Sequence, residues 1–316
     1  KVCGAALRSG DIGFAESFID EDWSSPDLVE LLKVFIANRE AVESAIYGSW
    51  WGSLLYRIKH LLNGNSRRGS RKNIHAHYDL GNDLFRLFLD PTMMYSSAVF
   101  PRPDASLEEA SLHKLDLICR KLELQPDDHL LEIGTGWGGL AIHAARHYGC
   151  RVTTTTISEN QFSYAQRRVL EAGLADRITV LSQDYRDLQG HYDKLVSVEM
   201  IEAVGHGFMD QYFRICSERL KPAGRMLLQS ITIADRYHEQ AMHAVDFIQK
   251  YIFPGGALPS MSSISSAVAR VTDLQISHLH DIGIDYARTL RIWRERFMNR
   301  LPEVRSLITQ VVMLQG

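Results

Sequence analysis

Few features of this 316-residue sequence mark it for a special environment. It has only four cysteines without CxxC spacing, which excludes a recognisable zinc motif and favours reduced thiols in the core over a disulfide framework. No apolar run approaches the ~20 residues that a membrane-spanning helix requires. The first residues also lack the pattern of a secretory signal. We therefore expect a cytoplasmic protein without a membrane span.

An excess of charge of either sign is also missing. Lys and Arg number 35 against 38 Asp and Glu, so the chain as a whole attracts neither nucleic acid nor anionic lipid. Contact with a membrane would depend on a local patch, and no nucleic-acid partner is expected. Hydrophobic residues make up 45% of the chain, which is typical of a globular protein of one large or two unequal domains. Since the chain begins at Lys1 rather than Met, we expect native residues before it.

The first 62 residues favour helices. Ser25 and Pro26 form an N-cap and a first-turn proline ahead of a periodic apolar series, which predicts a small helical domain over residues 1–62. Its last part, from Trp50 on, is rich in aromatic residues and leucine, and residues 63–72 form a basic, flexible linker. Two interpretations of the aromatic and basic stretch stay open: a helix packed on the rest of the protein, or an interfacial element against anionic lipid.

From about residue 73 the pattern changes to alternating strands and helices. Short buried runs predict strands over 129–133, 152–157, 178–181, 195–198 and 225–233, with helices over 160–172 and 212–220 among them. Such alternation is typical of an α/β fold with a mostly parallel, doubly wound sheet. A ligand is then expected at the carboxyl ends of the strands, near the point where the strand order reverses.

A glycine-rich loop follows the first predicted strand. Gly134, Gly136 and Gly139 satisfy the GxGxxG spacing of a dinucleotide site. Such a site also expects an acidic residue ~20 positions further on, but four threonines stand there, at positions 153–156. With Glu132 two residues before the loop, the run Glu-Ile-Gly-Thr-Gly-Trp-Gly instead resembles the first motif of the Rossmann-like S-adenosylmethionine (SAM) methyltransferases.

Further blocks extend this resemblance over most of the chain. Together they resemble the cyclopropane-fatty-acyl-phospholipid synthases and the related mycolic acid cyclopropane synthases, at residues 77–85, 89–91, 95–98, 134–139, 156–161, 183–187, 197–202 and 251–260. Residues 10–18 with Trp23 resemble the N-terminal lipid-binding domain of the phospholipid enzymes. The resemblance therefore implies a class I SAM methyltransferase domain over residues 73–316, preceded by a small helical domain.

The resemblance also implies a reaction. The SAM methyl group is transferred to a cis double bond of a membrane phospholipid, a proton is lost, and a cyclopropane ring closes. The protein would associate peripherally with the inner membrane, and a homodimer is left open. Implied SAM contacts are Tyr95, Ser96, Gly134, Gly136, Trp137, Thr156, Gln161 and Gln183. A bicarbonate ion would act as the base, held by Ser97, Glu202, Gln229, Ile231 and Tyr286. Tyr251 and Phe253 are candidate walls of the acyl channel, with a plain core role as the alternative.

Two positions of the expected bicarbonate site depart from the family pattern. Ser97 stands where many members have Cys, and Gln229 where many have His. Gln229 can donate a hydrogen bond to an anion but cannot carry charge. A methyl- or methylene-branched acyl chain therefore stays open as an alternative product to the ring. A non-catalytic lipid-binding protein is a further alternative. A small-molecule methyltransferase is a weaker one, because it leaves the N-terminal domain and the aromatic, basic segment unexplained.

Two further expectations concern the ends of the catalytic domain. His75, His77 and Asp79 on an extended segment could be metal ligands, but no other His or Cys cluster completes such a site, so we predict no metal. At the other end, residues 288–307 predict a helix and residues 308–314 resemble the family's last strand. The helical segment usual between these elements is missing, so we expect residues to be absent between Leu307 and Ile308.

Overall fold

A parallel sheet forms the centre of the computed structural model, which describes residues 1–38, 69 and 81–315. Its strands are β1 (His129–Ile133), β2 (Arg151–Thr156), β3 (Ile178–Ser182), β4 (Tyr192–Val198) and β5 (Leu220–Gln229). They lie in the order β3-β2-β1-β4-β5, and all neighbours pair in parallel. The winding reverses between β1 and β4, so the predicted doubly wound α/β fold is confirmed.

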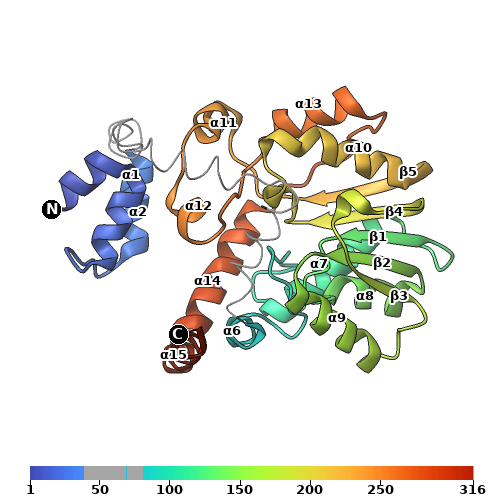
Figure 1. Ribbon diagram of the computed structural model, residues 1–316, viewed down its shortest axis with the longest axis horizontal. Helices are drawn as coiled ribbons and strands as arrows, with labels where there is room; N and C mark the ends of the chain where they lie inside the picture. The colour runs from blue at the N-terminus through green and yellow to red at the C-terminus, as the bar shows by residue number, and fades with distance from the viewer. Residues whose placement is uncertain (39–68, 70–80, 316) are drawn as a thin grey trace.

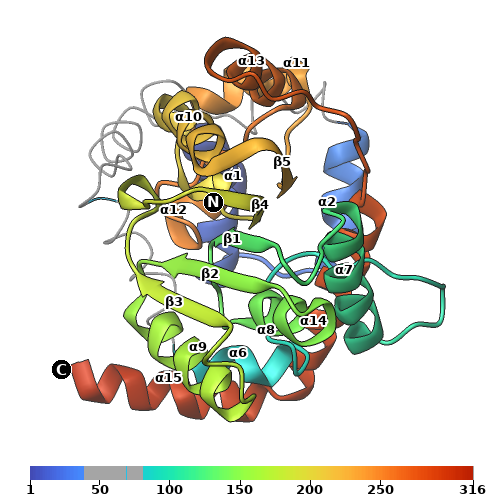
Figure 2. The same cartoon turned by 90° about the vertical axis from the view of Figure 1, so that its right-hand side faces the viewer.

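Helices cover both faces of this sheet (Figure 2). Successive strand residues point to opposite faces, so Leu130 joins a core with α7 (Leu107–Lys121), α8 (Gly139–Tyr148) and α9 (Glu159–Glu171). Its neighbour Leu131 joins the other core, with α10 (Met209–Arg219) and α13 (Met261–Val271). Each fully buried leucine contributes about 1.5–3 kcal/mol to folding. Three cysteines lie in these cores as expected, Cys119, Cys150 and Cys216, whereas Cys3 is exposed.

The last strand begins and ends earlier than predicted. Its final pair is Gln229 with Val198, the last residue of β4. The strand β5 ends at Gln229. Ile231 therefore lies past the end of β5 rather than within it. Its backbone N–H donates instead to the carboxylate of Glu202.

The C-terminal region corrects two predictions. The prediction of a single helix over 288–307 is wrong, because the helix is interrupted at Arg300. This residue separates α14 (Gly283–Asn299) from α15 (Leu301–Gln315). A strand over 308–314 is also wrong, because α15 continues through these residues. Pro302 lies in the first helical turn, where its missing N–H is not needed, and neither Gly nor Pro interrupts residues 303–315. The β-branched residues of this segment favour a strand only where a sheet receives them.

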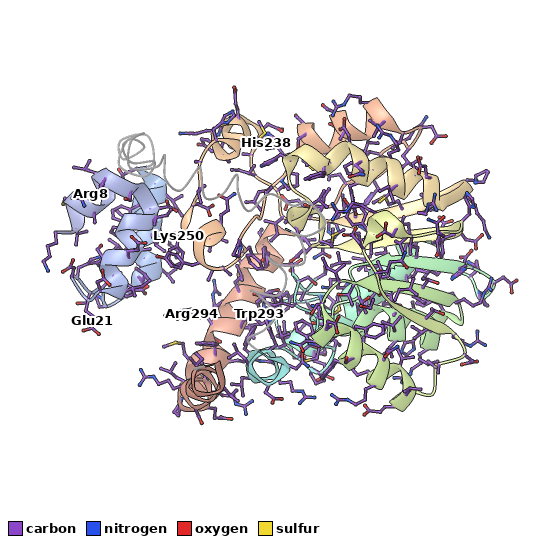
Figure 3. All side chains as sticks on the ribbon, in the orientation of Figure 1. Arg8, Glu21, His238, Lys250, Trp293 and Arg294 are labelled. Carbon is purple, nitrogen blue, oxygen red and sulfur yellow. The ribbon has the colours of Figure 1, made fainter. Side chains whose placement is uncertain are left out.

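The predicted helical N-terminal region is present and lies apart from the sheet. Its helices α1 (Val2–Ile19) and α2 (Leu28–Ala37) stand beside α12 (Phe247–Tyr251), which follows α11 (Asp235–Met242) (Figure 1). The backbone N–H of Phe247 donates to Asp11 over 2.9 Å, and Lys250 forms an ion pair with Glu16. Figure 3 shows Lys250 on the side of α12 that faces these helices.

Some predictions fall outside the described residues. They are the aromatic stretch from Trp50, the basic linker except Gly69, and the candidate metal ligands His75, His77 and Asp79. Within residues 1–38 and 81–315, no helix combines the length and apolar character that crossing a bilayer requires.

Candidate active site

A cavity of about 980 Å³ lies at the carboxyl ends of the strands. Segments that follow all five strands contribute to its lining, for example Gly134 after β1, Gln183 after β3 and Glu199 after β4. Helix α14 closes one side, and α1 and the segment around α12 close another. The cavity therefore lies where a ligand was predicted, at the switch point between β1 and β4 at which the strand order reverses.

The glycine loop between β1 and α8 forms one wall of the cavity. Gly134, Gly136 and Gly138 have φ angles of 103°, 52° and 83°, a region that favours glycine. A Cβ added at Gly136 would meet no atom of the protein within 4 Å. The loop therefore exposes backbone, and a ligand can approach it without meeting a side chain.

A buried glutamate stands just before this loop. Glu132 lines the cavity and accepts a hydrogen bond from Thr154 Oγ1 over 2.6 Å. Burial raises its pKa to about 8, partly opposed by this hydrogen bond. Thr154 in turn bonds to Thr135 over 2.7 Å, so the loop is tied to both of the first two strands.

Polar side chains extend the cavity past β2 and β3. Thr156 Oγ1 donates to Gln161 Oε1 over 3.0 Å, and the Gln183 amide donates to the Asp187 carbonyl oxygen over 2.6 Å. Next to Gln183, Asp184 forms a nearly fully buried ion pair with Arg186 at 2.7 Å. These groups give the same wall a series of fixed donors and acceptors.

Aromatic rings form a further part of the site. Tyr95 lies 5.1 Å from Phe85 and 5.3 Å from Trp293, measured between ring centroids. Trp137 packs on Phe85 at 4.9 Å, and its Nε1 donates to Asn82 over 2.7 Å. In Figure 3, Trp293 lies on the side of α14 that faces the sheet, with Arg294 on the opposite side. Such ring faces can stabilise a cation.

Glu202 brings a carboxylate to the cavity lining, from the short helix η2 (Ile201–Ala203) after β4. Its Oε1 accepts from the Ile231 backbone N–H at 2.5 Å and from Ser230 Oγ at 3.0 Å. Its Oε2 is buried without a hydrogen-bond partner among the described residues. Burial, helped by the charge of Glu199, raises the pKa of Glu202 to about 7.

A second carboxylate, which the sequence did not lead us to predict, lies beside it. Glu199 directly follows β4 and lines the cavity. Its Oε1 accepts from the Ser97 backbone N–H over 2.9 Å and from Gln229 Nε2 over 2.8 Å. Burial raises its pKa, while the charge of Lys114 opposes that rise. Lys114 is itself buried on α7 and donates to Ser96 Oγ over 2.6 Å.

The structure brings most of the predicted site residues together. Those that line the cavity are Tyr95, Ser96, Gly134, Gly136, Trp137, Thr156, Gln161, Gln183, Glu202, Ile231, Phe253 and Tyr286. Ser97 and Gln229 lie directly behind the lining, bonded to Glu199. Tyr251 does not line the cavity, contrary to expectation, because it is the last residue of α12 and its hydroxyl bonds to Glu16.

The arrangement can be tested against the two small molecules that the resemblance implies. SAM fits, since a bare glycine backbone, fixed amides and a buried carboxyl group stand together at the switch point. Bicarbonate does not fit, since the donors expected to hold it from Ser97, Gln229 and Ile231 are occupied by Glu199 and Glu202. An added anion would also lie between two carboxylates.

The doubly wound sheet and its glycine-lined cavity define the class as SAM-dependent methyltransferase, which comparison with known proteins bears out. The solved structure of a mycolic acid cyclopropane synthase complexed with S-adenosylhomocysteine (SAH) and CTAB has a TM-score of 0.70 at 33% identity, covering 75% of this chain and 86% of that one. Coclaurine N-methyltransferase, at 22% identity and a TM-score of 0.63, shares the fold.

Sequence comparison defines the family within this class. Residues 65–315 match the mycolic acid cyclopropane synthetase family. A tuberculostearic acid methyltransferase of Mycobacterium tuberculosis is 40% identical over 301 residues, covering 93% of this chain and 70% of that protein. The cyclopropane-fatty-acyl-phospholipid synthase of Escherichia coli is 38% identical over 300 residues, covering 94% and 75%. The chain therefore belongs to the mycolic acid cyclopropane synthetase family.

Proposed function

We propose that this enzyme transfers the methyl group of SAM to the double bond of an unsaturated phospholipid acyl chain and closes a cyclopropane ring. The observation that carries the proposal is one continuous cavity in which a glycine loop, aromatic rings and buried carboxylates meet. The similarity to the Escherichia coli phospholipid enzyme supports the acyl substrate and the ring.

The SAM contacts proposed for this chain are those of the glycine-loop wall. Gly134 and Gly136 let the backbone approach the ligand, and Gln161 and Gln183 offer amides held by Thr156 and Asp187. When bound there, SAM supplies an electrophilic methyl group. The remaining proposed contacts, Tyr95, Ser96 and Trp137, lie where this wall meets the aromatic rings.

The acyl chain is proposed to occupy the apolar part of the cavity. Methylation of a double bond leaves a carbocation on the chain, which water must not reach and which aromatic faces can stabilise. Tyr95, Trp293 and Tyr286 provide such faces. Loss of a proton from the transferred methyl group then gives the ring.

Contact with a membrane surface is part of the proposal. Ile248 and Phe253 both line the cavity and are 49% and 39% exposed. On the neighbouring α2, Val34 and Ile36 are 56% and 72% exposed. Apolar side chains at the cavity mouth would let an acyl chain enter from lipid. We accordingly propose residues 1–62 as a lipid-binding domain joined to the catalytic domain by the basic segment 63–72.

A branched acyl chain is the second candidate product. It is favoured by Gln229, which replaces the expected imidazole, and by the similarity to a protein named as a tuberculostearic acid methyltransferase. A hydride shift before proton loss would give a methylene branch from the same cation. Both routes lose a proton from the transferred methyl group, so both need the same kind of base.

Mass spectrometry of the acyl chains tests the function. The protein is incubated with methyl-labelled SAM and vesicles of unsaturated phospholipid. A labelled cyclopropane supports the first candidate, and a labelled chain without a ring replaces it by the second. An unlabelled lipid, with SAH binding measured on the same sample, would refute acyl methylation.

A further inference from the structure

Glu199 occupies the hydrogen-bond donors that an external anion would need. The Ser97 backbone N–H and Gln229 Nε2 both donate to the same oxygen, Glu199 Oε1, at 2.9 and 2.8 Å. The N–H of Ile231 is taken in the same way by Glu202. The expected anion site is therefore filled by carboxylates of the chain itself.

Electrostatics also oppose an added anion here. Glu199 and Glu202 are close enough for the charge of the first to raise the pKa of the second. Lys114 is a buried cation that acts on Glu199, and it is shared with Asp90. A bicarbonate would add a further negative charge to this group, in which Lys114 already serves both Glu199 and Asp90.

From these contacts we propose that Glu199 is the proton acceptor of the reaction, standing in place of an exchangeable bicarbonate. The proposal rests on the proposed function, since it names the base for acyl methylation. It makes the enzyme independent of bicarbonate.

The proton transfer is balanced within the site. A C–H bond of the transferred methyl group breaks, and its proton passes to the Glu199 carboxylate. The electron pair of that bond forms the new C–C bond of the ring, or the C=C bond of a methylene branch, and neutralises the cation. Once the product leaves the cavity, the proton returns to solvent. No oxidant or further reactant is required.

The backbone supports a functional role for Glu199. Its φ angle is 47°, a left-handed conformation that is unfavourable for a residue with a side chain. The bend places Glu199 at the end of β4 with its backbone N–H bonded to the Gln229 carbonyl oxygen over 2.8 Å. Non-glycine residues held in this way concentrate at active sites.

The hydrogen bond between Gln229 and Glu199 also explains why an amide stands at position 229. A side chain opposite a carboxylate needs to donate a hydrogen bond, which a neutral amide does without titrating. Lys114 already supplies the positive charge that acts on Glu199. The chain thus has a fixed carboxylate with an amide donor where the family resemblance implies a bound anion with an imidazole.

A binding measurement, which needs no turnover, tests whether Glu199 occupies the place of the bicarbonate ion. The SAH complex is titrated with ¹³C-labelled bicarbonate and followed by NMR. We expect no binding to the wild type, and binding to Glu199→Gly, which vacates both donors and relaxes the backbone. Glu123→Gly is the matched control, because Glu123 also has a positive φ, of 53°, but lies exposed outside the cavity. It should not bind.

A rate measurement tests the role as base. In bicarbonate-free buffer the wild type should keep its rate of lipid methylation, whereas Glu199→Gln should lose ~10²- to 10⁴-fold, the contribution typical of a general base. Its affinity for SAH should stay unchanged. Added bicarbonate should partly restore Glu199→Gly but not Glu199→Gln, whose amide still fills the site.

Three results would overturn the inference: bicarbonate binding to the wild type, loss of wild-type activity without bicarbonate, or full activity of Glu199→Gln. Failure of the proposed function looks different. In that case the wild type methylates no lipid under any condition, while the titration of wild type and Glu199→Gly still decides whether Glu199 fills the anion site.

Discussion

The backbone N–H of Ile231 donates a hydrogen bond of 2.5 Å to Glu202 Oε1. The other carboxylate oxygen, Glu202 Oε2, is buried with no hydrogen-bond partner in the described part of the chain. One oxygen fixes the side chain, while the other is left without a hydrogen bond from the described residues, in a residue that lines the cavity. Burying a half-satisfied carboxylate is costly. This cost supports the proposed role of Glu202 in the reaction over a role in folding.

Glu202→Gln should separate SAM binding from the lipid reaction. The amide oxygen can still accept from Ile231, so the shape of the site is kept, but the negative charge is lost. We expect SAH affinity close to that of the wild type and lipid methylation slowed by ~10²-fold, as for loss of one electrostatic contact to a transition state. Calorimetry with SAH and the labelled-lipid assay measure the two effects. Equal losses in both would contradict the division of roles.

The same substitution should change how stability depends on pH. Burial raises the pKa of Glu202 to about 7, above its ordinary value of 4.5. Between these values the folded protein binds more protons than the unfolded chain, so this group's contribution to stability is present at low pH and is lost as pH rises. Glu202→Gln should gain on the order of 1–3 kcal/mol relative to wild type between pH 5 and pH 8. Urea unfolding at both values measures this, and an equal difference at both would contradict it.

Gly136→Ala should weaken SAM binding by occupying space rather than by unfolding the loop. The matched control is Gly173→Ala, since both glycines have positive φ angles, 52° and 68°, and neither has a neighbour within 4 Å of an added Cβ. Both variants should lose about 1 kcal/mol of folding free energy. Only Gly136→Ala should bind SAH at least about tenfold more weakly. Similar SAH affinities for the two variants would remove the loop from the SAM site.

The ion pair between Glu16 and Lys250 should couple the N-terminal helices to the cavity mouth. It joins α1 to α12, and its side chains are 33% and 18% exposed. Glu16→Lys brings two cations together and should reduce methylation of vesicle lipid while leaving SAH binding unchanged. The charge swap with Lys250→Glu should restore most of the activity, with a coupling of up to ~1 kcal/mol. Additive losses in the double variant would show that the contact has no such role.

Features set by local pattern were predictable from the sequence. Buried apolar runs located the five strands, and the spacing of Gly134, Gly136 and Gly139 located the loop at the switch point. The strand predicted over 308–314 failed because β-branched residues decide little when the preceding helix continues. The prediction that Tyr251 lines the cavity also depended on distant structure. Only the position of α1, which carries Glu16, shows which way the Tyr251 hydroxyl points.

The buried charges could not be read in the same way. Lys114 lies among the apolar positions of α7, where a sequence does not reveal whether a cation finds a partner. Glu199 is three residues from Glu202, but its partners Ser97 and Gln229 are 102 and 30 residues away. One local signal was available, because an acidic residue directly after a central strand lies at the carboxyl edge of the sheet, where ligands bind.

Lys114→Met tests whether Glu199 must be ionised for the reaction. Burial raises the pKa of Glu199, and the charge of Lys114 is the largest influence that lowers it. Without that cation the pKa should rise further, so a smaller fraction of Glu199 is ionised at a given pH. The acid limb of the pH–rate profile should therefore move to higher pH. Lys121→Met, on the same helix but not among the charges that act on Glu199, is the control and should leave the limb in place.

A measurement of stability shows whether the variant has lost the buried charge itself. Burial lowers the pKa of Lys114 to about 8, below its ordinary value of 10.5. Between these values the unfolded chain binds more protons than the folded protein, so this group makes wild-type stability rise with pH. Lys114→Met should lack that rise. If it does, and the variant binds SAH normally, an unmoved acid limb would mean that ionisation of Glu199 does not control the rate.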